Sequence, residues 1–387
     1  MHQRPIIALL GGGQLGRMFI ENALRYDARV HVLDPDPQCP CADIAERFVR
    51  GSFADHDTVL RFVHDADVVG IEIEHVSVSA LDAARAMGKR VIPDPAVLRT
   101  IQDKGAQKLF YRDHGIPTAP FMLVDGRAAL LAAPPILPAF LKARTGGYDG
   151  KGVMALRGPA DLPIAFEGPS VVEQQVAVAL ELAVLVVRDE AGNTVTYEPV
   201  EMVFDPRYNL VDHLRAPARL EVGILERARQ LAVQVADAFN APGLYAVELF
   251  LTTDGALLVN ETAPRAHNSG HHTIEACASS QFDQLLRLYL GLPIGDARLR
   301  AHAAMVNLVG EGGRGEPVLD GLSDIVHVPG AFVHLYGKRE TRDGRKMGHV
   351  TLLADDHTGL DQGIAVTRLH GRVVPTTPNA TTTPTRT

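Results

Sequence analysis

Apolar and polar positions follow two different periods over the first hundred residues. Strand-like runs occupy residues 6–10, which are all apolar, and residues 29–33, 67–73 and 89–92, where apolar residues are mixed with polar ones. Between the first two runs, apolar residues recur at the spacing of one helical stripe, at Leu15, Met18, Phe19, Ala23 and Tyr26. Strands separated by helical spans predict a parallel sheet with crossover helices.

From residue 93 the pattern becomes mixed, and Pro93-Asp94-Pro95 marks a predicted boundary region. The pattern predicts helices at residues 103–114, 225–239 and 280–289, a strand at 139–143, β-structure over 171–200 and a hairpin over 244–263. After residue 297 the composition is typical of strands, with turns at 311–315 and 343–344. The tail from residue 375 is nearly all Thr and Pro, so we expect it to be disordered.

Composition narrows the class of protein. The 387 residues are 46% hydrophobic and 22% charged, which excludes a disordered chain, a collagen-like fibre and a coiled coil. The formal net charge of -8 disfavours a general nucleic-acid binder but leaves anionic small ligands open. No apolar run approaches membrane-spanning length, and the three cysteines are too few for a disulfide framework. We therefore expect a cytoplasmic protein that binds neither nucleic acid nor membrane.

The glycine-rich segment from Gly11 to Gly16, which includes Gly13, Gln14 and Leu15, satisfies G-x-G-x-x-G between a strand and a helix. Glycine lets the backbone approach a phosphate, and the helix N-terminus presents free N–H groups to it. Asp34 lies near where an NAD protein has its ribose-binding acid. The segment favours a nucleotide or phosphate site, and a plain tight turn is the alternative.

Two further segments carry candidate ligand groups. Glu72 and Glu74 lie on one face at the end of a predicted strand, where open parallel sheets bind ligands, although a solvated sheet edge would look the same. Residues 142–152 hold four glycines between cations, which suits a loop that folds over a polyphosphate. This loop lacks the usual P-loop pattern, and a flexible hairpin tip is the alternative.

The predicted hairpin at residues 244–263 gives the sharpest chemical expectation. Asp254-Gly255 is a preferred two-residue turn, and a register centred on it places Glu248 opposite Glu261. Opposed carboxylates repel, and their apolar neighbours leave them poorly hydrated. A divalent cation would remove both problems, and Mg²⁺, or Mn²⁺ in its place, suits oxygen ligands beside a polyphosphate. One neutral carboxylic acid or a shifted register is the alternative.

Two polar runs complete the candidate chemistry. Residues 260–272 combine a fixed cation, amides and imidazoles, a set that suits a small planar anion such as bicarbonate, whereas adjacent His271 and His272 make a poor zinc pair. Residues 338–349 carry five basic and two acidic residues around Asp343-Gly344, which can turn this segment into a phosphate-binding hairpin or a solvated basic one.

These motifs, in this order, resemble the ATP-grasp superfamily and, more narrowly, the N5-carboxyaminoimidazole ribonucleotide synthetase family. The resemblance covers about residues 6–370. It is carried by GGGQLGRM from Gly11, EIEHV from Glu72, DKGAQKLF from Asp103, LKARTGGYDGKG from Leu141, NETAPRAHNSGHHT from Asn260, and GRKMGH near the end. Residues 203–210 lack the histidine pattern of that family.

The resemblance implies an α/β and α+β architecture with the ATP-grasp fold. It implies a Rossmann-like substrate-binding domain at residues 1–100, a two-lobed ATP-grasp body at 101–296 with a lid loop near 146–152, a β-rich domain at 297–372 and a disordered tail at 373–387. It also implies a homodimer that carboxylates 5-aminoimidazole ribonucleotide with bicarbonate and ATP, through carboxyphosphate, in purine biosynthesis.

The resemblance implies these site residues. ATP would contact Lys104, Lys142, Gly147, Tyr148, Asp149, Gly150, Lys151, Gly152, Glu173, Gln174, Glu181 and Asn260. Mg²⁺ would be bound by Glu248 and Glu261. The ribonucleotide and bicarbonate would contact Gly13, Gln14, Leu15, Glu74, Arg265, His267, Asn268, Lys338, Arg345 and Lys346. The catalytic groups would be Arg265, His267 and Tyr148.

Three other readings stay open. Another ATP-grasp ligase, such as a formate-dependent glycinamide ribonucleotide transformylase or a biotin carboxylase, would share the ATP half. An NAD-dependent dehydrogenase would use the glycine motif and Asp34 but leaves Glu248 and Glu261 unexplained. A non-catalytic nucleotide-binding regulator would lack a metal carboxylate or a lid lysine, and both are present in the sequence.

Overall fold

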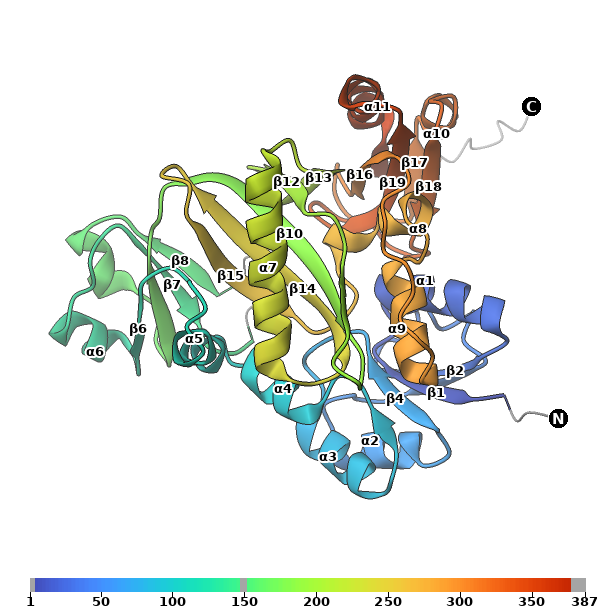
Figure 1. Ribbon diagram of the computed structural model, residues 1–387, viewed down its shortest axis with the longest axis horizontal. Coiled ribbons are helices and arrows are strands. Elements are labelled where there is room, and N and C mark those ends of the chain that lie inside the picture. The colour runs from blue at the N-terminus through green and yellow to red at the C-terminus, as the bar shows by residue number, and fades with distance from the viewer. Residues whose placement is uncertain (1–3, 147–151, 377–387) are drawn as a thin grey trace, which may run out of the picture.

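The computed structural model describes residues 4–146 and 152–376. Within these residues the strands form sheets of five, four, nine and two strands. Figure 1 shows the four-stranded sheet at one end of the molecule, the large sheet in the middle, and the N-terminal and C-terminal units together at the other end. The polar residues of interest lie where the four-stranded sheet meets the large one.

The N-terminal unit confirms the predicted parallel sheet, with the strand order β3-β2-β1-β4-β5. Its elements are β1 (Ile6–Leu10), α1 (Gln14–Ala23), η1 (Leu24–Tyr26), β2 (Arg29–Asp34), β3 (Arg47–Arg50), α2 (His56–Val63), β4 (Val68–Ile71), α3 (Val78–Ala86), β5 (Arg90–Val91) and α4 (Pro95–Ile101). Parallel strands place their carboxyl ends at one sheet edge, so the loops after β1, β2 and β4 gather there.

The four-stranded sheet is antiparallel, in the order β6-β9-β7-β8, and α5 precedes it in the chain. This part contains α5 (Lys104–Asp113), β6 (Phe121–Val124), α6 (Arg127–Ala132), β7 (Ala139–Ala143), β8 (Val153–Leu156), η2 (Pro159–Ile164) and β9 (Ser170–Gln174). The Asp103 side chain caps α5 by accepting the N–H groups of Gly105 and Ala106. The cap fixes where α5 begins and so directs Lys104 into the first turn.

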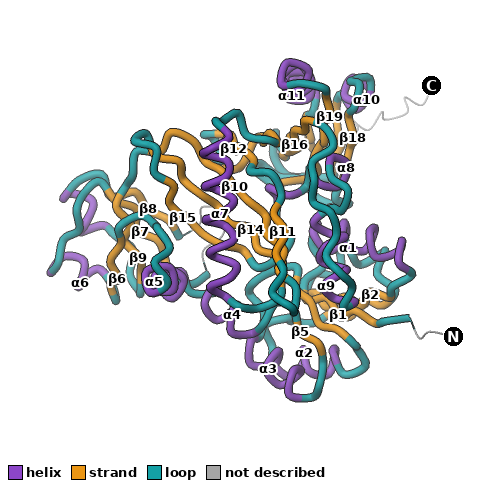
Figure 2. Tube along the Cα trace, in the orientation of Figure 1, coloured by secondary structure: helices purple, strands orange, loops and turns teal. Residues whose placement is uncertain are grey.

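The large sheet forms the middle of the molecule, and α7 covers one of its faces (Figure 2). This part contains β10 (Val178–Arg188), β11 (Thr194–Thr196), β12 (Val200–Asp205), β13 (Leu210–Ala216), α7 (Val222–Phe239), β14 (Gly243–Thr252), β15 (Leu257–Ala263), η3 (Asn268–Gly270), α8 (Thr273–Ala276) and α9 (Gln281–Leu290). The apolar stripe of α7, including Leu225 and Val235, packs on Val184 and Val247 of β10 and β14. That packing holds the β14–β15 hairpin in place.

The C-terminal unit continues the same sheet, because β16 pairs with β13 and β19 pairs with β16. Its elements are β16 (His302–Val309), β17 (Pro317–Asp320), α10 (Leu322–Val326), β18 (Ala331–Leu335), β19 (Lys346–Ala354), α11 (His357–His370) and β20 (Arg372–Pro375). The predicted start of a disordered tail at residue 373 is wrong, since residues 373–375 pair with β17. The rest of that predicted tail, from residue 377, lies outside the described residues.

Candidate active site

The β14–β15 hairpin places Glu248 directly opposite Glu261, which confirms the predicted pairing. The turn itself differs from the prediction. A three-residue loop, Thr253-Asp254-Gly255, pairs Thr252 with Ala256 and puts Gly255 at φ +83. That loop shifts the register by one residue, and a bulge between Glu248 and Leu249 shifts it back. The two departures cancel, so the carboxylates still face each other.

The two facing carboxylates differ in their ionisation. Burial, and then the charge of Glu261, raises the pKa of Glu248. Glu261 behaves in the opposite way, because the Lys104 ammonium donates to its Oε2 at 2.7 Å and lowers its pKa. The Asn260 amide donates to Glu248 Oε2 at 3.3 Å. The protein therefore compensates the charge of Glu261 but not that of Glu248, and a further cation would compensate the second carboxylate.

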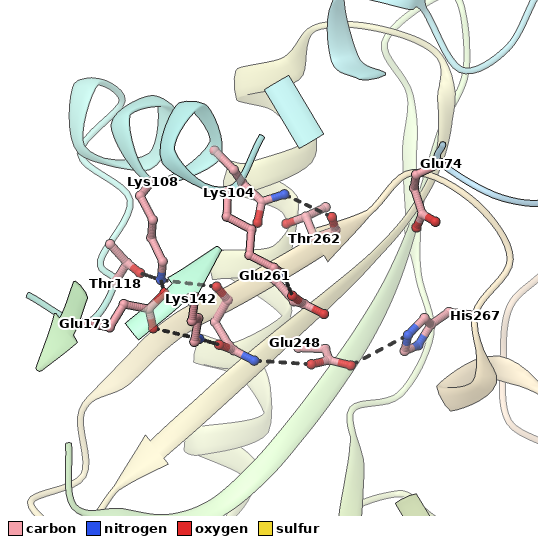
Figure 3. A network of polar contacts seen from close by, with 12 residues as sticks. Glu74, Lys104, Lys108, Thr118, Lys142, Glu173, Glu248, Glu261, Thr262 and His267 are labelled. Carbon is pink, nitrogen blue, oxygen red and sulfur yellow. Dashed lines mark hydrogen bonds and ion pairs between the residues drawn. The ribbon is translucent and has the colours of Figure 1, made fainter. Parts of the chain in front are cut away.

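A second set of polar groups lies next to this pair (Figure 3). Lys142 on β7 donates from Nζ to Glu173 Oε2 at 2.8 Å and to Asn260 Oδ1 at 3.4 Å. Glu173 lies on β9, and nearby charges, first of all Lys108, lower its pKa against the effect of burial. Burial raises the pKa of Glu181 on β10, and Lys142 partly opposes that rise. The structure thus brings the predicted ATP residues of both sheets together, with Gln174 at the end of β9.

Most of the predicted lid lies outside the described residues, namely Gly147, Tyr148, Asp149, Gly150 and Lys151. Gly152 is described, with φ +73, and its carbonyl accepts from the N–H of Ala143 at 2.8 Å. The predicted roles of the five other residues stay predictions.

Beyond the β14–β15 hairpin, the residues predicted to bind the ribonucleotide and bicarbonate begin four residues after Glu261, at Arg265. Arg265 is buried, and its Nη2 lies 2.7 Å from Glu74 Oε1, which joins the large sheet to the N-terminal unit. His267 Nε2 lies 3.6 Å from Glu248 Oε1, and Ser269 donates its backbone N–H to His267 Nδ1 at 3.3 Å. Burial lowers the pKa of His267 to about 3, so the imidazole is neutral at pH 7. Figure 3 shows His267 and Glu74 at the side of the hairpin away from Lys108.

The glycine-rich segment corrects one expectation. Its N–H groups are not all free for a phosphate, because Gly12 donates to Asp34 Oδ2 at 2.8 Å and Leu15 donates to Glu72 Oε1 at 3.2 Å. A Cβ at Gly13 would lie 2.3 Å from Glu72 Oε1, so glycine there admits a carboxylate. Burial raises the pKa of Glu72 to about 7. Glu72, which the sequence predicts as a candidate ligand group, instead accepts from the N-terminus of α1 at Leu15.

The basic segment at residues 338–349 is not a hairpin centred on Asp343-Gly344. Strands β18 and β19 pair Leu335 with Gly348, and a ten-residue loop joins them. Lys338 donates from Nζ to the carbonyl of Lys346, and Arg345 donates from Nη1 to the carbonyl of Glu340. The loop therefore keeps these three cations at the start of β19, although by backbone contacts that the turn motif did not predict.

The amide and imidazole run continues into the core. Asn268 Nδ2 donates to Asn307 Oδ1 at 2.9 Å, and Asn307 Nδ2 donates to Asn268 Oδ1 at 3.0 Å. The predicted substrate contact of Asn268 stays a prediction. The ring of His271 stacks on His349 at 4.8 Å, and its Nδ1 accepts a hydrogen bond from the Gln281 side-chain amide at 3.0 Å. In the part of the chain that is described, no group of three or more His, Cys, Asp or Glu is arranged to hold a metal. No helix among residues 4–146 and 152–376 is long and apolar enough to span a membrane.

Three protein-family models match the sequence, one after another. A ribonucleotide synthetase preATP-grasp domain matches residues 5–102, an ATP-grasp domain matches residues 109–282, and a phosphoribosylaminoimidazole carboxylase C-terminal domain matches residues 303–363. An N5-carboxyaminoimidazole ribonucleotide synthase of Brucella melitensis is 37% identical, over 89% of this chain and 95% of the relative. A phosphoribosylaminoimidazole carboxylase of Schizosaccharomyces pombe is also 37% identical, but this chain spans only 66% of its length.

Solved structures are similar over nearly the whole chain. N5-carboxyaminoimidazole ribonucleotide synthetase of Thermotoga maritima superposes with a TM-score of 0.88 at 38% identity, covering 96% of this chain and all of the other. N5-carboxyaminoimidazole synthase of Aspergillus clavatus, in complex with ADP and 5-aminoimidazole ribonucleotide, gives 0.85 at 34% identity, covering 95% of this chain and 100% of the other.

Proposed function

This chain belongs to the N5-carboxyaminoimidazole ribonucleotide synthase family, and from that premise we propose how its site carries out the family reaction. The chain has the ATP-grasp fold and is an ATP-dependent carboxylating ligase of purine biosynthesis. It joins bicarbonate to 5-aminoimidazole ribonucleotide, with ATP as the energy source, and yields N5-carboxyaminoimidazole ribonucleotide, ADP and phosphate.

One observation carries the assignment of the site. Cations and carboxylates from both sheets converge on the β14–β15 hairpin, and Arg265 and His267 continue the same strand toward the N-terminal unit. A phosphoryl donor beside Lys104 and Lys142 would therefore lie next to an anion held by Arg265. The Aspergillus relative, whose complex contains ADP together with the ribonucleotide, supports a site that takes both ligands at once.

Each group has a physical task in the proposed reaction. The ammonium groups of Lys104 and Lys142 offset the charge that develops on the transferred phosphoryl group. Bound Mg²⁺ would add to that stabilisation, and Glu248 and Glu261 suit it because two carboxylates plus phosphate oxygens are its usual ligands. Arg265 presents a planar fork of donors that matches bicarbonate. Neutral His267 accepts at Nδ1 from Ser269, so its Nε2 carries the proton and can donate one hydrogen bond without adding charge.

We propose that carboxyphosphate forms from bicarbonate and the γ-phosphate, and that the ribonucleotide amine captures the carboxyl group. Such an intermediate hydrolyses readily, so the site must exclude water while it exists. Arg265, His267 and Glu248 keep only 16–19% of their side chains exposed, which supports a site on the hairpin side that a bound ligand could close to water. The ribonucleotide phosphate would bind at Lys338, Arg345 and Lys346, which converge at the start of β19.

The decisive experiment measures phosphate release by the purified protein. With Mg²⁺, ATP and bicarbonate present, 5-aminoimidazole ribonucleotide should stimulate release by at least about tenfold, because the acceptor commits the activated carboxyl group. Glycinamide ribonucleotide with formate is the matched control and should not stimulate it. Equal release with and without the aminoimidazole ribonucleotide would overturn the proposal.

The NAD-dependent alternative finds no support in the glycine segment. Asp34 accepts the N–H groups of Gly12 and Asp36, so its carboxylate serves its own loop. The other ATP-grasp ligases differ in the last domain, where the matched family model is that of phosphoribosylaminoimidazole carboxylase. The homodimer and the cytoplasmic location that were expected stay predictions.

A further inference from the structure

Two lysines one helical turn apart on α5 have different surroundings. Lys104 keeps 27% of its side chain exposed and reaches Glu261. Lys108 is only 3% exposed. Lysine is rarely buried unless it is paired, because removing an ammonium from water costs on the order of several kcal/mol. Lys108 is enclosed and does not present its ammonium to solvent as Lys104 does, so direct contact with a ligand does not explain its burial.

Lys108 contacts three segments that are far apart in the sequence. Its Nζ donates to Thr118 Oγ1 at 2.6 Å and to the carbonyl of Asn260 at 3.2 Å, and it lies 3.4 Å from Glu173 Oε1. Thr118 in turn donates to the carbonyl of Val259 at 2.7 Å. Figure 3 shows Lys108 descending from α5 onto this group. One ammonium thus ties α5 to β9 of the four-stranded sheet and to β15 of the large sheet.

The Glu173 carboxylate lies between two lysines. Lys108 faces one of its oxygens, and Lys142 donates to the other at 2.8 Å. Of the two lysines, only Lys142 is also within reach of the Asn260 side chain at the cleft. If Lys142 turns toward a polyphosphate, Glu173 loses one cation and keeps the other. Without Lys108, the buried carboxylate would retain Lys142 or become protonated.

We propose that Lys108 is a positioning residue of the nucleotide site, which orients Glu173 and compensates its charge so that Lys142 is released to the phosphates of ATP. This inference rests on the proposed function, because it takes the ligand of Lys142 to be ATP. Lys108 acts through Glu173 and touches no substrate. The alternative is a lysine that only stabilises the junction of the two sheets.

The experiment is a double-mutant cycle on the full chain with Lys108→Met, Glu173→Gln and the double variant. The readouts are the Kd of a non-hydrolysable ATP analogue with Mg²⁺, the KM for ATP, the KM for the ribonucleotide, and the melting temperature. Lys108→Met should raise the Kd and the KM for ATP by about tenfold or more, while the KM for the ribonucleotide stays within about twofold. Lys108→Arg should recover part of the loss, and Lys89→Met on the exposed N-terminal surface is the matched control.

The cycle separates positioning from stability. If Lys108 acts through Glu173, the double variant should bind the analogue no more weakly than the worse single variant. It should also melt above Lys108→Met, because both buried charges are gone. Additive losses in binding, or unchanged binding in Lys108→Met, would overturn the proposal. If Lys108→Met does not fold, the comparison of the double variant with Glu173→Gln decides alone. Analogue binding needs no turnover, so failure here is distinct from failure of the carboxylation assay.

Discussion

Two buried polar regions meet at the β14–β15 hairpin, and they accommodate polar groups in different ways. On the side of the four-stranded sheet, buried charges are paired, as in Lys108 and Lys142 with Glu173. On the side of β19, the buried groups are imidazoles, and His271, His334 and His349 stack beside Tyr336. Burial lowers the pKa of both His271 and His349 well below the usual value, so they stay uncharged.

The difference teaches what each region can do. A paired charge can exchange its partner for a charged ligand, because the ligand supplies the same compensation. The neutral imidazoles of His271 and His349 offer no such exchange, and their rings fill space in the interior. We therefore infer that the charged side binds the ligands, whereas the imidazole side only stabilises the fold. The predictions below test this division, beginning with the largest expected effect.

Glu261→Gln should cause the largest loss. Removing one carboxylate from the pair weakens the proposed metal site and leaves Lys104 without its partner. Turnover should fall by about a hundred- to a thousand-fold, as when one preorganised electrostatic group is removed, while ATP still binds weakly. Steady-state phosphate release measures it, and Glu226→Gln on the exposed face of α7 is the control. Turnover within tenfold of wild type would mean that Glu261 holds no metal.

Arg265 lies at the boundary between the two sides, and Arg265→Lys should have an effect of intermediate size. Lysine keeps the charge but loses the planar fork that faces Glu74 and, in the proposed reaction, bicarbonate. The kcat/KM for bicarbonate should fall by about ten- to a hundred-fold, with the KM for ATP little changed. Arg298→Lys, which alters an exposed arginine, is the control. A larger rise in the KM for ATP than in that for bicarbonate would place Arg265 on the nucleotide side.

The double variant His349→Phe/Tyr336→Phe should have the smallest effect, and on stability alone. His349 Nδ1 and the Tyr336 hydroxyl bond each other at 3.0 Å, so changing both leaves no buried group unpaired. Imidazoles that stay neutral when folded bind protons when unfolded, so the wild type loses stability as the pH falls below about 6.5. Removing one of them should weaken that acid sensitivity by about 1 kcal/mol.

Melting temperatures at pH 7.5 and pH 5.5 measure the effect, and the difference between them should shrink in the double variant. Its turnover at pH 7.5 should stay within about threefold of wild type. A large loss of turnover would show that the imidazole side takes part in the reaction. An unchanged melting difference would show that His349 does not resist protonation.

Much of the charged side could be predicted from sequence, because its residues lie in short segments with strong local patterns. Asp103 caps α5 and directs Lys104, and the hairpin pattern pairs Glu248 with Glu261. Even there, the Asp254-Gly255 motif predicts a two-residue turn, whereas the chain forms a three-residue loop. A bulge next to Glu248 then restores the predicted pairing. Bulges depend on packing across the sheet, and a turn motif does not contain that information.

Other features could not be predicted, because tertiary contacts decide them. Lys108 has the spacing of a polar residue on a helix surface, and only the arrival of β9 and β15 buries it. Helix α11 contains Gly359 and Gly363, which disfavour a helix, but it packs on β16 and β19 through Leu360 and Ile364. Glu72 closes α1 from a different strand, so no motif near Gly11 reveals it.

The pairing of β13 with β16 has a consequence for how such proteins can diverge. The matched ATP-grasp model ends at residue 282 and the matched C-terminal model begins at residue 303, as if the last domain were a separable module. Yet the backbone ladder crosses from β13 to β16, so each part completes the sheet of the other. The last domain can therefore be inherited only together with a β13 strand that pairs with its β16. Exchange between lineages would have to preserve that register, whereas insertions in the outer loops would be tolerated.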